Sequence, residues 1–83
     1  MTHFIYILYS ESKDKYYVGA AENVDKRLER HNAGASKSTK SGRPWKVVHT
    51  EEFDTKTEAL KREIQIKKKK SRKYIEWLIS PSH

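Results

Sequence analysis

The hydrophobic pattern is strongest near the N-terminus, where two apolar runs are separated by a short polar stretch. Residues 4–9 (FIYILY) are aromatic, β-branched or aliphatic without interruption, which is typical of a strand covered on both faces. After the polar stretch, residues 16–18 (YYV) resume the β pattern until Gly19 ends it. The pattern predicts a β-hairpin in which Tyr6 lies roughly opposite Tyr17, so that two phenols share one face.

A helical period follows the hairpin. Asn23 is a typical N-cap residue, and Val24 and Leu28 define the inward face of a helix that is predicted to end near His31. On the same helical wheel Arg27 and His31 also occupy core-facing positions. These two polar side chains either lie at the edge of the apolar stripe and reach solvent, or belong to a site.

The composition changes at residues 32–44, where small, hydroxyl and cationic residues predominate. We expect a loop there, with Lys37, Lys40 and Arg43 spaced along it. Such a loop offers a mobile surface suited to phosphate groups, although a solvated connector has the same composition. Residues 45–53 then predict a third, short strand.

A second helix is predicted to begin at or near Thr55, because Thr55 and Glu58 have the spacing of a capping box. Its predicted apolar arc comprises Ala59, Leu60, Ile64 and Ile66. Glu63 projects into the middle of this arc, where an unpaired carboxylate costs several kcal/mol. A metal ion, strong hydrogen-bond donors, or an ion pair with Arg27 or a neighbouring lysine would satisfy it.

Four consecutive lysines, residues 67–70, are predicted to extend this helix. A run of this kind is most often a solvated face, and here Lys67, Lys68 and Lys70 are also candidates for contacts with phosphate groups. A short terminal helix is predicted over residues 72–79, with Ser71 as its N-cap.

Length and charge narrow the range of functions. The 83 residues predict one domain, residues 1–83, and the absence of cysteine excludes disulfides and thiolate zinc sites. With no apolar run near 20 residues and no signal-like segment, we expect a cytoplasmic protein that does not interact with membranes. The net charge of +7 favours a polyanionic partner, nucleic acid in the first place, although small basic proteins are common.

The residues with candidate chemical roles occur in a definite order along the chain. They are Phe4-Ile5-Tyr6, Tyr17-Val18-Gly19, Arg27, His31 and Glu63. Ten residues separate Tyr6 from Tyr17, and Arg27 follows Tyr17 by ten. Over nearly the whole chain this ordered set resembles the GIY-YIG nuclease superfamily, in particular its small standalone bacterial members.

The resemblance implies an α/β fold of the α+β type, with a three-stranded antiparallel sheet flanked by helices. It also implies a metal-dependent endonuclease that hydrolyses phosphodiester bonds in DNA, in the setting of repair or recombination. The hairpin, the third strand and the helices predicted above agree with this fold. Partners or a homodimer would direct so small a domain, but no interface is identifiable from the sequence.

The resemblance also assigns roles to single residues. Tyr6 and Tyr17 would lie near the attacking water, Arg27 would face the scissile phosphate, and Glu63 would hold one Mg²⁺ or Mn²⁺ ion. A hard cation that keeps most of its waters needs only one or two carboxylates. Either Tyr6 or His31 would accept the proton; a phenol with an ordinary pKa of about 10 needs help, whereas an imidazole titrates near neutrality.

Four features of the sequence bear on how closely the chain follows the family pattern. Gly19 matches it and would let the backbone approach without a Cβ. Phe4 replaces the first glycine, and Ala20 stands where the excinuclease relatives have a lysine. No asparagine follows Glu63 as it does in several branches. These departures leave open an alternative, a nucleic-acid-binding module with weak or no cleavage.

Overall fold

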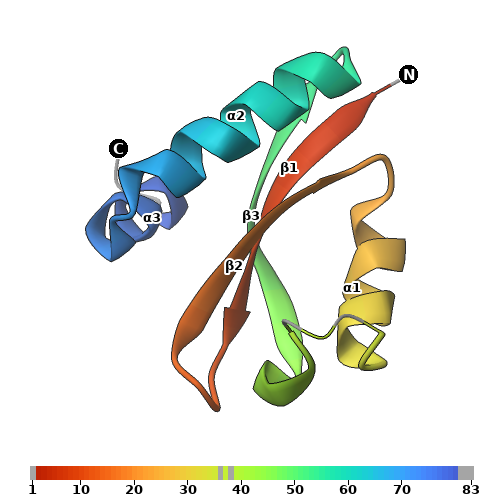
Figure 1. Cartoon of the computed structure of the whole chain (residues 1–83), viewed down its shortest axis with the longest axis vertical. Coiled ribbons are helices and arrows are strands. Elements are labelled where there is room, and N and C mark those ends of the chain that lie inside the picture. The colour runs from red at the N-terminus through yellow and green to blue at the C-terminus, as the bar shows by residue number, and fades with distance from the viewer. Residues whose placement is uncertain (1, 36, 38, 81–83) are drawn as a thin grey trace.

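A three-stranded antiparallel sheet forms the centre of the computed structural model, which describes residues 2–35, 37 and 39–80. Its strands are β1 (His3–Ser10), β2 (Lys15–Ala21) and β3 (Trp45–Phe53), in the order β2-β1-β3. β1 is therefore the central strand, with helices on both sides of the sheet (Figure 1). This arrangement confirms the expectation that the first apolar run is covered on both faces.

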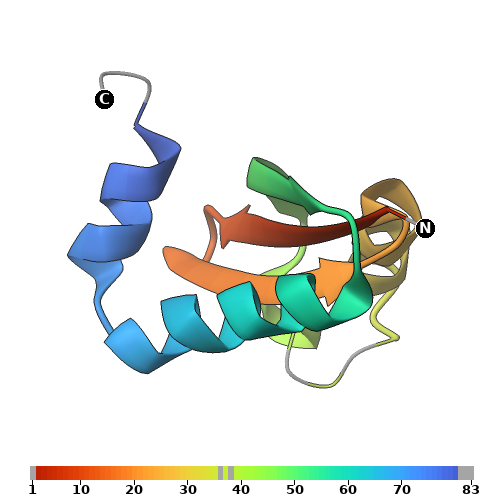
Figure 2. The same cartoon turned by 90° about the horizontal axis from the view of Figure 1, so that it is seen from above.

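The described residues also form three α-helices and one 3₁₀ turn: α1 (Val24–Asn32), η1 (Lys40–Gly42), α2 (Lys56–Lys69) and α3 (Arg72–Ile79). Each α-helix begins at a predicted N-cap, because the side chains of Asn23, Thr55 and Ser71 accept hydrogen bonds from first-turn backbone amides. Figure 2 shows α2 running along the sheet beside β2, with α1 and α3 at opposite ends of the molecule. None of the helices in the described part of the chain is long and apolar enough to cross a membrane.

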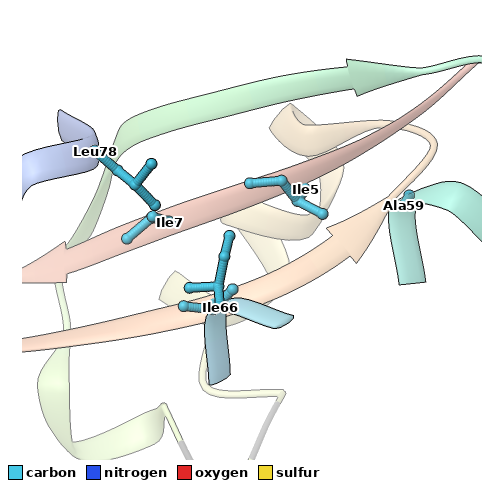
Figure 3. Packing of buried hydrophobic residues seen from close by; sticks show 6 residues of the cluster. Ile5, Ile7, Ala59, Ile66 and Leu78 are labelled. Atoms are coloured by element: carbon cyan, nitrogen blue, oxygen red, sulfur yellow. The ribbon is translucent and has the colours of Figure 1, made fainter. Parts of the chain in front are cut away.

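The alternation of side chains along β1 produces a separate core on each face of the sheet. Ile5 and Ile7 point toward α2 and α3 (Figure 3). The buried residues of that core are Ile5, Ile7, Val18, Ala59, Ile66 and Leu78. On the other face Tyr6 and Leu8 pack with Ala21 and Trp45, and α1 covers them. The odd positions of β1 thus build the larger apolar core, and the even positions lead to the site described below.

The predicted hairpin register is wrong by two residues. Ser10 pairs with Lys15, so that the turn contains four residues and Tyr6 faces Gly19. Leu8 is the residue opposite Tyr17. Because the length of the turn sets the register, the two tyrosines are diagonal neighbours, although they still lie on one face.

The predicted inward face of α2 also needs correction. Ile64 is 62% exposed and Leu60 is 38% exposed, whereas Ala59 and Ile66 are buried. The stripe that faces the sheet contains Ala59, Glu63 and Ile66, which are three to four residues apart. The helix ends at Lys69 and not at Lys70, which adopts a left-handed backbone conformation with φ 49°.

Candidate active site

The aromatic ring of Tyr6 lies across Gly19 on the neighbouring strand. A Cβ atom at position 19 would lie 2.5 Å from both Cζ and the hydroxyl oxygen of Tyr6. No side chain is therefore compatible with this ring position, and the glycine allows Tyr6 to reach toward β2, an edge strand of the sheet. Gly19 permits a close approach, as expected, but the group that approaches in the structure is a tyrosine ring.

Tyr6 and His31 meet in the buried interior between the sheet and α1. The Tyr6 hydroxyl lies 3.1 Å from Nε2 of His31, and Nδ1 of His31 lies 2.8 Å from the Thr39 hydroxyl. Tyr6 is 1% exposed, His31 3% and Thr39 0%. The prediction that His31 faces inward is therefore confirmed, whereas Arg27, which was predicted to face the core as well, is exposed. The His31 ring joins two hydroxyl groups in one hydrogen-bonded chain.

Thr39 was not predicted as part of the site, because nothing in a polar loop distinguishes it from its neighbours. Its position depends on Trp45, whose indole nitrogen donates to the Thr39 carbonyl at 2.6 Å. The Asn32 side chain accepts from the Trp45 amide and donates to the Trp45 carbonyl. A Cβ at Gly42 would clash with the Trp45 ring. Part of the loop is thus packed against the core, which a solvated connector would not be.

Burial changes the proton affinity of both groups. It raises the pKa of the Tyr6 phenol to about 12, and the neighbouring Tyr17 and Glu63 add to this rise, whereas Arg27 opposes it. Burial also lowers the pKa of His31, and the positive charges of Arg27 and Arg30 lower it further. At neutral pH the site therefore holds a protonated phenol beside a neutral imidazole.

Tyr17 closes the aromatic side of the site. Its ring centre lies 6.5 Å from that of Tyr6 and 4.9 Å from that of His31, in an edge-on arrangement with the imidazole. It also contacts Trp45 edge-on at 6.4 Å. A small cavity of about 80 Å³ lies beside these rings, lined by Tyr17, Arg27, Arg30, His31 and Ala35. Tyr17, His31 and Arg27 therefore line one cavity, and the buried Tyr6 contacts this group through Tyr17 and His31.

Glu63 approaches from α2, and its side chain is 17% exposed. Its Oε2 accepts a hydrogen bond from the Lys67 ammonium at 2.9 Å. The Glu63 carboxylate is close enough to Tyr6 to raise the pKa of that phenol. The same ammonium lies 5.8 Å from the centre of the Tyr17 ring. Of the partners considered for Glu63, the structure shows a neighbouring lysine and not Arg27.

The donor set near Glu63 is compatible with a hard divalent cation. Among the described residues there is no group of three His, Cys, Asp or Glu that could hold a metal ion. A magnesium-like ion keeps several waters and needs only one or two carboxylates, and the Glu63 carboxylate already has a cation as its partner.

The predicted nucleic-acid contacts are all on the surface. All six of the predicted residues are exposed: Lys37, Lys40, Arg43, Lys67, Lys68 and Lys70. Lys67 and Lys70 line a cavity of about 440 Å³ that also contains Tyr17. Arg43 has a structural contact as well, because its Nε donates to the Lys40 carbonyl at 2.9 Å. A second cavity of about 400 Å³, which includes Arg27 and Arg30, lies near Ala20.

The fold and this arrangement of side chains define a class of protein. The sequence matches the GIY-YIG catalytic domain over residues 2–75, and the chain belongs to the GIY-YIG domain family, whose members are typically nucleases. The resemblance noted in the sequence is thereby confirmed, and so is the three-stranded α+β fold.

The relatives are small proteins of similar length. The chain is 49% identical over 67 residues to a UPF0213 protein of Staphylococcus saprophyticus, covering 78% of this chain and 79% of the relative. It is 49% identical over 69 residues to a UPF0213 protein of Syntrophus aciditrophicus, covering 80% and 77%. The solution NMR structure of a UPF0213 protein from Bacillus halodurans is similar with a TM-score of 0.61 and 34% identity, over 99% of this chain and 86% of that one.

Proposed function

We propose that this domain is a divalent-metal-dependent endonuclease that hydrolyses phosphodiester bonds in DNA. The observation that carries the proposal is the convergence of five side chains from β1, β2, α1 and α2. These are Tyr6, Tyr17, Arg27, His31 and Glu63. Membership of the GIY-YIG family supports nuclease chemistry, and the net charge of +7 supports a polyanionic substrate.

In this proposal Arg27 and Glu63 act on the charge of the phosphate. Hydrolysis builds negative charge on the phosphate and leaving oxygens, and a fixed guanidinium stabilises that charge more in the transition state than in the ground state. Arg27 lines the small cavity beside His31 and Tyr17, where a phosphate oxygen would reach it. Glu63 would hold one Mg²⁺ or Mn²⁺ ion, which supplies Lewis-acid stabilisation of the same charge.

Proton transfer falls to the chain formed by Tyr6, His31 and Thr39. With its pKa near 12, the Tyr6 phenol is protonated in the free protein and is a poor base by itself. It becomes competent if its proton moves to Nε2 of His31 as it accepts one from water. This transfer needs the tautomer in which Nδ1 donates to the Thr39 hydroxyl. We therefore assign His31 as the final proton acceptor and Tyr6 as the group that orients the water.

The surface cations would hold the nucleic-acid backbone on both sides of this site. Lys67 and Lys70 line the cavity next to Tyr17, and Arg27 and Arg30 line the cavity near Ala20. Contacts between these cations and phosphate groups are independent of the DNA sequence and release counterions. We therefore expect binding that weakens steeply with salt.

The experiment is an incubation of plasmid and branched DNA with the protein in EDTA, in Mg²⁺ and in Mn²⁺. The proposal predicts strand cleavage only when a divalent ion is present. The alternative, a binding module on the same scaffold, is supported by the ion pair that already neutralises Glu63. It predicts DNA that is retarded on a gel but uncut under all three conditions.

A further inference from the structure

Lys67 lies one helical turn after Glu63 and contacts two groups of the candidate active site. Its ammonium is 2.9 Å from Oε2 of Glu63 and 5.8 Å from the centre of the Tyr17 ring. The Glu63 side chain is 17% exposed and that of Lys67 is 52% exposed. The carboxylate that would hold the metal therefore has an exposed ammonium as its partner.

This ion pair is easily exchanged. Pairs four residues apart on a helix are weak when one partner reaches solvent, because water and salt compete with them. The lysine side chain is long and flexible, and Lys67 also lines the cavity of about 440 Å³ beside Tyr17, together with Lys70 and Arg72. The Lys67 side chain can thus also extend toward that cavity, where its ammonium would meet an anion.

Resting on the proposed function, we propose that Lys67 exchanges between Glu63 and the substrate phosphate. Without metal its ammonium neutralises Glu63. When a divalent ion takes the carboxylate, the ammonium is released and contacts a phosphate next to the scissile bond. Lys67 is therefore a positioning residue that makes the binding of metal and the binding of DNA mutually favourable. Metal binding releases the Lys67 ammonium for the DNA, and DNA binding releases the Glu63 carboxylate for the metal.

The coupling is measured with Ca²⁺ as the metal and a short fluorescent DNA duplex at constant ionic strength, by fluorescence anisotropy. For the wild type we expect Ca²⁺ to raise the DNA affinity. In K67M this enhancement should be smaller by about two- to fivefold, the range given by weak ion pairs. The matched control K68M removes the adjacent lysine, for which no contact with Glu63 is seen. It should weaken DNA binding equally with and without Ca²⁺.

A second measurement uses no DNA. Binding of Mn²⁺, followed by electron paramagnetic resonance, should be about two- to fivefold tighter in K67M than in the wild type, because the competing ammonium is gone. Lys68→Met should change it less than Lys67→Met does. An equal Ca²⁺ enhancement in Lys67→Met and wild type, or unchanged Mn²⁺ affinity in K67M, would overturn the proposal for Lys67.

Failure of this proposal is distinguishable from failure of the proposed function. If E63Q binds Mn²⁺ as tightly as the wild type, the metal does not bind at Glu63, and the proposed function loses its metal ligand. If E63Q abolishes Mn²⁺ binding while K67M leaves it unchanged, the metal assignment holds and only the exchange is wrong.

Discussion

Replacement of Gly19 by alanine tests the geometry that brings Tyr6 into the site. The added Cβ would lie 2.5 Å from the hydroxyl oxygen and Cζ of Tyr6, far inside van der Waals contact. Tyr6 is 1% exposed, and its hydroxyl is held by His31 at 3.1 Å, so the ring has no free space into which to retreat. The substitution should therefore force the ring or the strand to move.

Two opposing effects set the magnitude. Overpacking a buried position costs roughly 1–3 kcal/mol. Alanine in a strand gains about 0.5–1 kcal/mol over glycine from backbone entropy. The expected net loss for Gly19→Ala is then about 1–2 kcal/mol of the free energy of unfolding, or roughly 5–10 °C in Tm for a domain of this size.

Urea denaturation followed by circular dichroism measures this loss. The control is a double-mutant cycle with Tyr6→Val, which removes the ring atoms that the new methyl group would meet. In that background Gly19→Ala should be neutral or stabilising. If Gly19→Ala stabilises the otherwise unchanged protein, the close approach of the Tyr6 ring is wrong.

Three further predictions concern the hydrogen-bonded chain and the cationic surface. Burial holds the pKa of His31 below 6.5, so near that pH the unfolded chain binds more protons than the folded one. The free energy of unfolding should therefore fall as the pH drops from 6.5 toward the folded pKa. In urea titrations at several pH values, His31→Gln should reduce this dependence on pH. Thr39→Val removes the hydroxyl from a fully buried position and should cost about 1–3 kcal/mol in the same assay, whereas Thr39→Ser should cost less because it keeps the partner of His31; equal losses would argue against that hydrogen bond. The double variant K67A/K68A should weaken DNA binding across sequences and make the salt dependence shallower by about two counterions, and an unchanged slope would remove both lysines from the contact surface.

Local signals in the sequence predicted most of the elements. The three N-caps and the bounds of β3 and α3 are where turn chemistry and β-type residues placed them, because these features depend on neighbours in the chain. The hairpin register was missed because it depends on the number of residues in the turn, which composition does not determine.

Only part of the candidate site could be predicted from the sequence. The predicted inward positions of His31 and Glu63 are found in the structure, since both follow from helical periodicity. Leu60 and Ile64 were misplaced because α2 presents the Ala59–Glu63–Ile66 side to the sheet, which the apolar residues alone do not specify. The buried position of Thr39 depends on Trp45, Asn32 and Gly42 folding around it, a long-range packing effect with no local signature.

The rate of Mn²⁺-dependent plasmid nicking by Glu63→Gln, with DNA affinity measured on the same preparation, tests the proposed reaction most directly. Glu63 and Gln have nearly the same shape, and the lysines that supply the electrostatic attraction are unchanged. We predict that nicking falls by at least about 100-fold while DNA binding is retained. Equal nicking by Glu63→Gln and the wild type would contradict the assignment of Glu63 and the metal-dependent reaction built around it.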